Sequence, residues 1–421
     1  MKPLLVMALC AAIAGFVAIS GTAQVSAPRR IINCPVGSPA GVTAAAFSPS
    51  GTRLAYARQA RAGDVSIVVS TLRGRVVTRR ANDLPGAPTA LTWAPIGSRL
   101  AYVSGDELHV LDASDRIMLR GNGRIAIGGW LPDASTLVIS TGLLPSAESY
   151  LVDTITGAVR DLGPGARAVP SPDGTRIALS VSMPSPSDVF PGQSQHLQVL
   201  NLASGERRTI FRSRAPLTAL AWSPDSRQIA FLWYIDEEPD LMAQNADGTS
   251  TGLFGREHGA LPTQIGMIAP IRWTRRGIVG NALFEDRGSA VAFYDVVTGR
   301  PRYRGVSGYV ASIADVSGSG HVAYIAGPAD VLPGAAGSGL RVAVWPGTDD
   351  RSLFPCRGTS GSDQLKASVD PTTILAGAGN DVVDARNHQR DVVDCGSGAD
   401  TVKLDHADVA RACERVQRSR Q

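Results

Sequence analysis

One phrase recurs seven times through most of the chain and constrains the fold more than any other feature. It joins an aromatic residue, a turn of the Pro-Asp-Gly type and a strand-like apolar run, as in WSPDSRQIAFL from Trp222. The other copies begin at Phe47, Trp93, Trp130, Pro170, Trp273 and Asp315. Successive starts are 46, 37, 40, 52, 51 and 42 residues apart. The chain therefore repeats one structural unit of about 40–50 residues.

Each unit reads as a set of short β-strands. The turn leads into a strand such as RLAYA, and a later strand ends in a tight turn, as in SYLVDTITG at 149–157. Helical periodicity is absent from these units. About four strands per unit, repeated seven times, predict an all-β chain with a seven-bladed β-propeller, and six blades is the alternative.

The repeated phrase resembles the TolB-type, WD40-like β-propeller repeat, whose hallmark is Trp-Ser-Pro-Asp-Gly followed by Ile-Ala-Phe. The chain matches it at 222–225 with 229–231, and at 171–174 with 177–178. This resemblance covers residues 43–354 and implies a propeller over that range. We interpret the repeated tryptophans as core residues rather than ligand-stacking residues.

A second, shorter period follows the propeller repeats. Polar residues recur at intervals of 9, 9, 10 and 9 residues, at Asp363, Thr372, Asp381, Asp391 and Asp400. Two residues after each of them stands an apolar residue: Leu365, Ile374, Val383, Val393 or Val402. Such a period describes a short parallel β-roll in which each half-turn has a loop and a strand, and we assign it to residues 355–421.

The loops of this region resemble the haemolysin-type calcium-binding repeat, called RTX, with the pattern Gly-Gly-x-Gly-x-Asp. The matching residues are Gly358, Gly361, Asp363, Gly377, Gly379, Asp381, Gly396, Gly398 and Asp400. Thr359, Ala376 and Cys395 stand where the pattern has a further Gly. The resemblance implies that Ca²⁺ binds between stacked Gly-rich loops along one edge, at no more than two sites. A β-roll that no longer binds metal is the alternative.

The N-terminus has the pattern of a secretory signal peptide. Residues 1–23 combine a lysine, an apolar run and the small residues Gly21 and Ala23, which predicts cleavage after Ala23. An uncleaved membrane anchor is the alternative, and the mature chain has no later segment long enough to span a membrane. We therefore expect a secreted, extracellular protein, with the periplasm or cell surface as further possibilities. Residues 24–42 form an N-terminal lead segment.

Four cysteines remain after removal of the signal peptide. In an exported chain, this even number predicts disulfides. We favour Cys395–Cys413 because the two are close in sequence, which leaves Cys34–Cys356 as the second pair. At 405–416, Val409, Ala412 and Val416 have helical spacing, so this segment is predicted to be a short C-terminal cap with Asp405 as its N-cap.

The residues favour a binding protein over an enzyme. The chain lacks a Gly-x-Ser-x-Gly nucleophile motif. Its histidines are dispersed, at His109, His196, His258, His321, His388 and His406. The basic residues are scattered, which argues against nucleic-acid binding. We expect an unidentified protein or glycan ligand on the propeller. The alternative is an extracellular polysaccharide lyase or hydrolase with its site in the central channel.

Overall fold

The computed structural model shows a propeller followed by a β-roll. It describes residues 30–34, 41–59, 65–72, 75–81, 84, 86–121, 123–142, 146–184, 193–215, 217–234, 239–249, 251–254, 271–284, 288–297, 301–304, 309–328, 339–344, 350–352, 356–367, 372–388 and 391–419. The regular structure of these residues is entirely β, in 37 strands. The signal-peptide prediction falls on residues outside these ranges.

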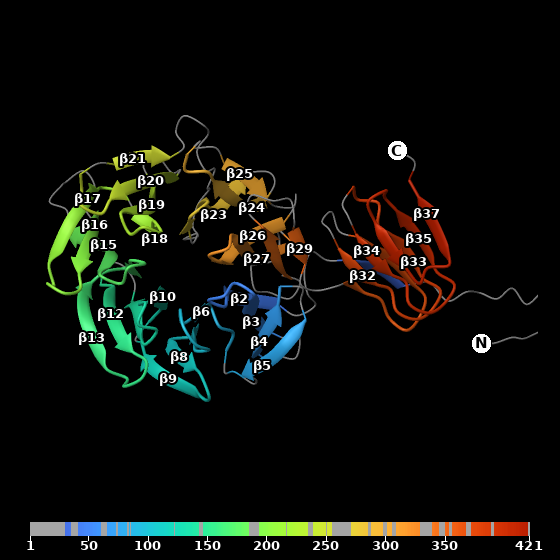
Figure 1. The fold of residues 1–421 in the computed structure, drawn as a ribbon, viewed down its shortest axis with the longest axis horizontal. Helices are drawn as coiled ribbons and strands as arrows, with labels where there is room; N and C mark the ends of the chain where they lie inside the picture. The colour runs from blue at the N-terminus through green and yellow to red at the C-terminus, as the bar shows by residue number, and fades with distance from the viewer. Residues whose placement is uncertain are drawn as a thin grey trace, which may run out of the picture.

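In each of the five four-stranded blades, the strands run in chain order from the middle of the propeller to its rim (Figure 1). The first three blades contain β2 (Gly41–Phe47), β3 (Arg53–Gln59), β4 (Val65–Thr71), β5 (Val76–Ala81), β6 (Ala90–Trp93), β7 (Leu100–Ser104), β8 (Glu107–Leu111), β9 (Asp115–Arg120), β10 (Ile125–Trp130), β11 (Thr136–Thr141), β12 (Glu148–Asp153) and β13 (Val159–Pro164). The next two contain β14 (Arg167–Pro170), β15 (Arg176–Pro184), β16 (Gln193–Asn201), β17 (Arg207–Ser213), β18 (Leu217–Trp222), β19 (Gln228–Tyr234), β20 (Pro239–Asn245) and β21 (Thr251–Phe254). The last contains β22 (Arg272–Thr274), β23 (Gly277–Phe284), β24 (Gly288–Tyr294), β25 (Pro301–Arg304), β26 (Tyr309–Val316), β27 (His321–Pro328), β28 (Gly339–Val344) and β29 (Asp350–Ser352).

The propeller has six blades, so the favoured prediction of seven is not supported. Five blades are four-stranded antiparallel sheets, whereas β22 to β29 belong to one eight-stranded sheet. That sheet contains both the sixth and the seventh sequence repeat, joined where β24 pairs with β26 at Gly288 and Tyr309. These two repeats depart furthest from the common phrase, and β22 has only three residues. The degraded repeats therefore share one blade.

The repeated phrase forms the contacts between neighbouring blades. Trp222 is buried, and its indole N–H donates to the carbonyl oxygen of Val169 in the preceding blade at 2.9 Å. Trp93 does the same to Ala46 at 3.1 Å. For Trp222 and Trp93, the interpretation as core residues is confirmed, because each packs between blades and uses its indole N–H there.

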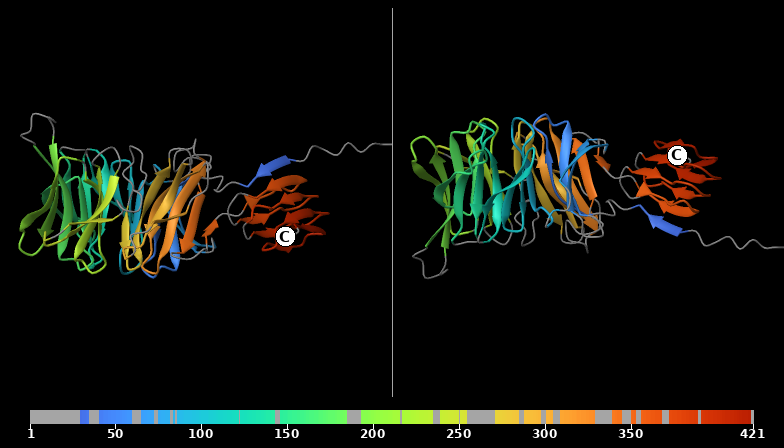
Figure 2. Two further views of the ribbon diagram at one scale, coloured as in Figure 1. Left: turned by 90° about the horizontal axis from the view of Figure 1, so that it is seen from above. Right: turned by 90° about the horizontal axis from the view of Figure 1, so that it is seen from below.

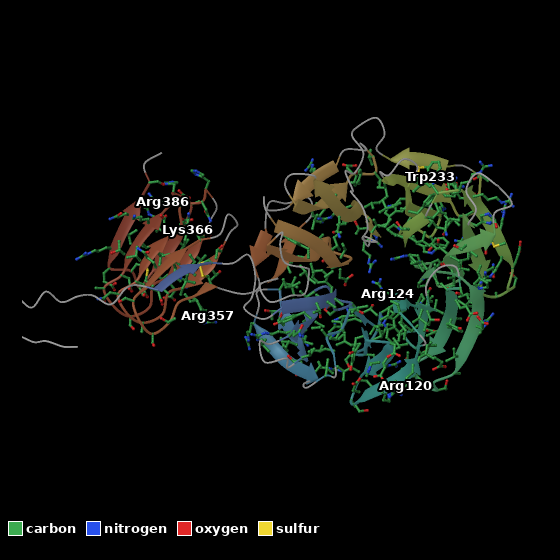
Figure 3. The ribbon with its side chains drawn as sticks, turned by 180° about the vertical axis from the view of Figure 1, so that it is seen from behind. Arg120, Arg124, Trp233, Arg357, Lys366 and Arg386 are labelled. Carbon is green, nitrogen blue, oxygen red and sulfur yellow. A yellow bond between two sulfur atoms is a disulfide. The ribbon has the colours of Figure 1, made fainter. Side chains whose placement is uncertain are left out.

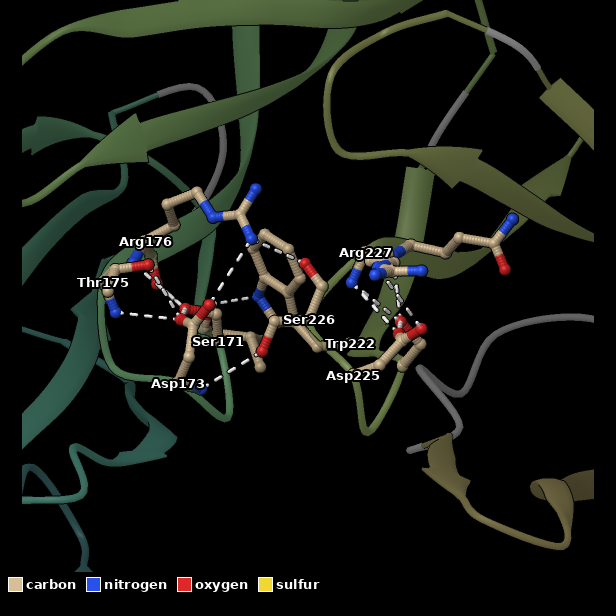
Figure 4. A network of polar contacts seen from close by, with 11 residues as sticks. Ser171, Asp173, Thr175, Arg176, Trp222, Asp225, Ser226 and Arg227 are labelled. Carbon is tan, nitrogen blue, oxygen red and sulfur yellow. Dashed lines mark hydrogen bonds and ion pairs between the residues drawn. The ribbon is translucent and has the colours of Figure 1, made fainter.

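The turns of the phrase are joined in the same way (Figure 4). Arg176 donates to the carbonyl oxygen of Ser226 in the next blade at 2.7 Å, and its guanidinium lies 5.2 Å from the centre of the Trp222 ring. Within each turn the Ser hydroxyl donates to the Asp carboxylate, Ser171 to Asp173 and Ser223 to Asp225, both at 2.6 Å.

We expect Arg176→Ala to lower the free energy of unfolding by about 1–2 kcal/mol, because it removes the hydrogen bond to Ser226 and the contact with Trp222. Urea denaturation followed by tryptophan fluorescence measures this loss. Arg227→Ala is the matched control: its side chain is 84% exposed and its ion pair with Asp225 is 4.0 Å long, so we expect a change within about 0.5 kcal/mol. Equal losses for the two variants would contradict this assignment.

The β-roll consists of two parallel sheets. One contains β1 (Arg30–Asn33), β31 (Asp363–Lys366), β33 (Val382–Asp384), β35 (Thr401–Leu404) and β37 (Arg415–Arg418). The other contains β30 (Cys356–Arg357), β32 (Thr373–Leu375), β34 (Val392–Asp394) and β36 (Val409–Arg411). The apolar residues of the nine-residue period fill the space between the sheets and are fully buried or nearly so: Leu365, Ile374, Val383, Val393 and Val402. Charged residues such as Arg357, Lys366 and Arg386 are exposed on the outside of the roll (Figure 3).

Both ends of the roll differ from the sequence predictions. The lead segment contributes β1, which joins the roll's first sheet beside β31 (Figure 2). The predicted helical cap is wrong, because β36 and β37 occupy that segment and extend the two sheets by one strand each. Ala412, between them, has a left-handed φ of 47°, which no α-helix accommodates. Asp405 is not a helix N-cap; its carboxylate accepts the backbone amides of Asn387 and His388.

Candidate metal centre

The three Gly-rich loops, at 358–363, 376–381 and 395–400, stack along one edge of the roll. Ala378 of the second loop and Ser397 of the third form a parallel bridge. The amide of Gly379 donates to the carbonyl oxygen of Ser397 at 2.9 Å, and that of Ala378 to Thr359 of the first loop at 3.3 Å. The structure thus brings together all nine Gly and Asp residues that the sequence pattern singled out.

The glycines allow successive loops to approach within backbone contact. Gly396 and Gly398 have φ angles of 86° and 147°. A Cβ on Gly396 would overlap the carbonyl oxygen of Gly377, and a Cβ on Gly398 would overlap that of Gly379. Since every other residue carries a Cβ, the stacking itself requires Gly at these positions. This requirement holds with or without a bound metal.

The three aspartates form a ladder through the roll. The amide of Asp363 donates to Oδ1 of Asp381 at 2.8 Å, and the amide of Asp381 donates to Oδ1 of Asp400 at 2.7 Å. Glu414 continues the ladder, because its Oε2 accepts the amide of Asp400 at 2.8 Å. The aspartates are at most 1% exposed. One oxygen of each later carboxylate therefore holds the turn before it in register.

Two of the remaining carboxylate oxygens are candidates for a cation. Oδ2 of Asp400 and Oδ1 of Asp363 are buried and have no hydrogen-bond partner among the residues that the structure describes. The other oxygen of Asp363 accepts both the amide and the hydroxyl of Thr359, at 2.5 and 2.8 Å. A buried carboxylate oxygen without a partner is costly, and a nearby cation is one way to offset that cost.

The opposite edge carries a second ladder, which sequence reasoning missed in part. The amide of Thr372 donates to Oδ1 of Asp391 at 2.6 Å, and that of Asp391 donates to Oδ1 of Asp408 at 2.8 Å. The backbone amide of Asp405 donates to the other oxygen of Asp408, Oδ2, at 2.6 Å. Asp408 lies 17 residues after Asp391, near the double period, and this spacing was the available signal. Burial, followed by repulsion from Asp408, raises the pKa of Asp391 to about 7.

Side chains alone do not form a metal site here. Within the part of the chain that the structure describes, no three or more His, Cys, Asp and Glu side chains gather as metal ligands. A calcium site in the Gly-rich loops would have to combine one or two carboxylates with backbone carbonyl oxygens, which are ligands that Ca²⁺ accepts. The donor set, of Asp and glycine-loop carbonyls, fits this hard cation.

The described histidines do not share one site. His109, His196 and His321 belong to different blades, while His388 and His406 lie in the roll and His258 falls outside the described ranges. His109 is the most connected: its ring nitrogens lie 3.1 Å from Glu107 and 3.2 Å from Asp115. Of these residues only His109 is buried, and all three lie on β8 and β9, the two outer strands of the second blade.

The cysteines form the two predicted disulfides. Cys395 bonds Cys413 within the roll, and Cys34 bonds Cys356 across 322 residues. The second bond joins the lead segment to the first strand of the roll. Its two cysteines belong to the buried core of the roll.

Comparison with known proteins identifies the fold. No protein-family model matches the chain. It is 38% identical over 52 residues, which is 12% of either chain, to the Tol-Pal system protein TolB of Thioalkalivibrio sulfidiphilus (strain HL-EbGR7). Among solved structures, the β-propeller domain of the trilobed protease from Pyrococcus furiosus, reported to have an open velcro topology, superposes with a TM-score of 0.56 at 16% identity, over 75% of this chain and 98% of that one. The fold is a β-propeller.

Two peptidases show the same likeness. The acylaminoacyl peptidase of Pyrococcus horikoshii has a TM-score of 0.54 at 13% identity, over 75% of this chain and 52% of that one. A puromycin-hydrolyzing peptidase of Mycobacterium tuberculosis has a TM-score of 0.53 at 14% identity, over 78% of this chain and 56% of that one. The chain thus spans about half the length of these enzymes, and at such identity the likeness concerns the fold alone.

Proposed function

We propose that the protein is a secreted, non-enzymatic binding protein whose β-roll is stabilised by Ca²⁺. The observation that carries the calcium assignment is the buried Oδ2 of Asp400, which lies in the third of three stacked Gly-rich loops and has no hydrogen-bond partner in the described part of the chain. In the first loop, by contrast, Thr359 already occupies one oxygen of Asp363. We therefore favour the gap between the second and third loops as the stronger site, with the first gap as the weaker one.

Further features support an extracellular role. Both disulfides would persist only in an oxidising compartment. Extracellular calcium modules bind Ca²⁺ at about 10⁻⁴–10⁻³ M, so the roll would be occupied outside the cell and empty inside it. Among the described residues, none forms a helix with the length and apolarity that a membrane crossing requires. The signal-peptide pattern of residues 1–23 completes this proposal.

The propeller would serve as the binding module, for a protein or glycan. Six blades around one axis offer a broad rigid surface, and loops on such scaffolds commonly carry binding residues. The peptidase neighbours match only over about half their length. Their hydrolytic activity is therefore no guide to this chain.

Calorimetric titration of the full-length mature protein tests the calcium proposal. We expect saturable binding of one or two ions, and at least about tenfold weaker binding in Asp400→Asn, which keeps the acceptor for Asp381 but removes the charge. Asp384→Asn is the matched control, because Asp384 pairs with Arg386 outside the stacked loops. Absence of heat at millimolar Ca²⁺ would defeat the proposal, as would equal weakening in both variants.

A further inference from the structure

The N-terminal strand is built into the β-roll rather than into the propeller. β1 pairs in parallel with β31, from Arg30 opposite Asp363 to Asn33 opposite Lys366. The amide of Cys34 extends this ladder by donating to the carbonyl oxygen of Lys366 at 2.8 Å. Ile32 packs against the roll's core. The roll thus contains chain from both sides of the propeller.

The propeller closes without exchanging a strand between its ends. The first blade is made of β2 to β5, and the last strands of the ring are β26 to β29, each set contiguous in sequence. Their contact consists of an apolar cluster that includes Tyr56 and Ile325, and of a hydrogen bond from the amide of Phe47 to Oδ2 of Asp315 at 2.8 Å. Among the described residues, no β-ladder joins β2–β5 to β26–β29.

The connections between roll and propeller are short. Residues 35–40 lead from Cys34 to β2, and residues 353–355 lead from β29 to Cys356. At full extension, Cys34 lies at most about 25 Å from the start of β2, and Cys356 at most about 14 Å from the end of β29. The Cys34–Cys356 bond therefore limits how far the first and last strands of the ring can separate. Figure 1 shows the roll beside this part of the propeller.

We propose that the β-roll is a clasp that holds the first and last repeats of the propeller together. The clasp has two fastenings: the Cys34–Cys356 bond and the pairing of β1 with β31. The second is sensitive to calcium, because β31 begins at Asp363, the last residue of the first Gly-rich loop. This calcium dependence rests on the proposed function, whereas the mechanical role of the disulfide does not.

Tryptophan fluorescence separates the two parts of the molecule. All six tryptophans lie between residues 93 and 345, so thermal unfolding followed by their emission reports the propeller alone. We expect the double variant Cys34→Ser/Cys356→Ser to lower the propeller midpoint by about 5–10 °C. Cys395→Ser/Cys413→Ser is the control: it removes a bond inside the roll but keeps the Cys34–Cys356 bond, so it should lower that midpoint by clearly less. Ca²⁺ at ten times its Kd should raise the wild-type midpoint by about 3 °C.

The outcomes decide the two claims separately. Equal midpoints for wild type and the Cys34/Cys356 variant would overturn the clasp. Calcium binding by calorimetry without any shift of the tryptophan midpoint would overturn the coupling and leave the calcium proposal intact. If calorimetry shows no calcium binding, the proposed function fails, and the disulfide comparison still decides the clasp. If the variant does not fold, the folded Cys395→Ser/Cys413→Ser variant replaces it: reduction and alkylation of this variant break only the Cys34–Cys356 bond, and the untreated variant is the control.

Discussion

Gly398→Ala unfolds the Gly-rich edge of the β-roll while the propeller stays folded. Gly398 has a φ of 147°, a backbone conformation that only Gly adopts without strain. The added Cβ would also overlap the carbonyl oxygen of Gly379 in the second Gly-rich loop. Neither backbone can move without breaking the ladder between Asp381 and Asp400. We expect the roll to lose about 3 kcal/mol or more, the sum of a forbidden backbone conformation and an overpacked contact.

Hydrogen exchange measured by mass spectrometry detects this loss, because the roll from Cys356 onward contains no aromatic residue for fluorescence. Peptides covering 376–404 should exchange much faster in the variant, with a far smaller change in the propeller, whose ends the Cys34–Cys356 bond still joins. Gly361→Ala is the control, since its added Cβ would meet only the hydroxyl of Thr359, at 3.8 Å. If the loops exchanged as slowly in Gly398→Ala as in Gly361→Ala, the close stacking of the loops would be contradicted.

The period of the tail predicted the arrangement of these loops correctly for a physical reason. In a parallel roll, a residue and its counterpart one full turn later lie in adjacent strands, so a sequence period becomes a column in space. Leu365, Val383 and Val402 form such a column, and their counterpart in the last turn, Val416, continues it. The spacing of Val409 and Val416 fits a helix as well as strands. In the structure this short segment forms strands, because β36 pairs with β34 and β37 pairs with β35.

Long-range pairing is a relation that local sequence patterns do not carry. Ile32 pairs with Leu365, so β1 belongs to the roll although the whole propeller lies between the two residues in the sequence.

The separation that matters is the one between the two cysteines, 322 residues along the chain. Local patterns do not reach across such a distance, so the lead segment looked independent of the roll. The even cysteine count was the only hint that residues before the propeller meet residues after it.

The sequence predicted the residues of the candidate site that stand at motif positions, and it did not predict those outside the motif. The glycines and aspartates of the three loops stand at motif positions, so the sequence located them. Glu414 and Asp408 end the two ladders. They follow Asp400 and Asp391 by 14 and 17 residues, which is less than the 18 or 19 residues of the earlier turns, so the motif period did not locate them. The structure was needed to show that their carboxylates accept the same kind of backbone amide.

Asp391→Asn stabilises the roll at pH 8. Burial and the neighbouring Asp408 raise the pKa of Asp391 from its ordinary value of 3.8 to about 7 in the folded protein. The folded state therefore binds the proton more tightly than the unfolded state does. The associated stability is fully present below pH 3.8, falls as the pH rises toward 7 and is absent above it. Asn stays neutral throughout and keeps an oxygen that accepts the amide of Thr372.

We expect the variant to be about 2–4 kcal/mol more stable than wild type at pH 8 and nearly equal to it at pH 4. Hydrogen exchange of peptides covering 391–411 at the two pH values measures the difference. Asp384→Asn should act in the opposite direction at pH 8, by up to about 1 kcal/mol, because hydrogen bonds from Arg386 lower the pKa of Asp384. If Asp391→Asn instead destabilised the roll at pH 8, the charged form of Asp391 would have a favourable partner, and the opposite edge would become a second candidate for a bound cation.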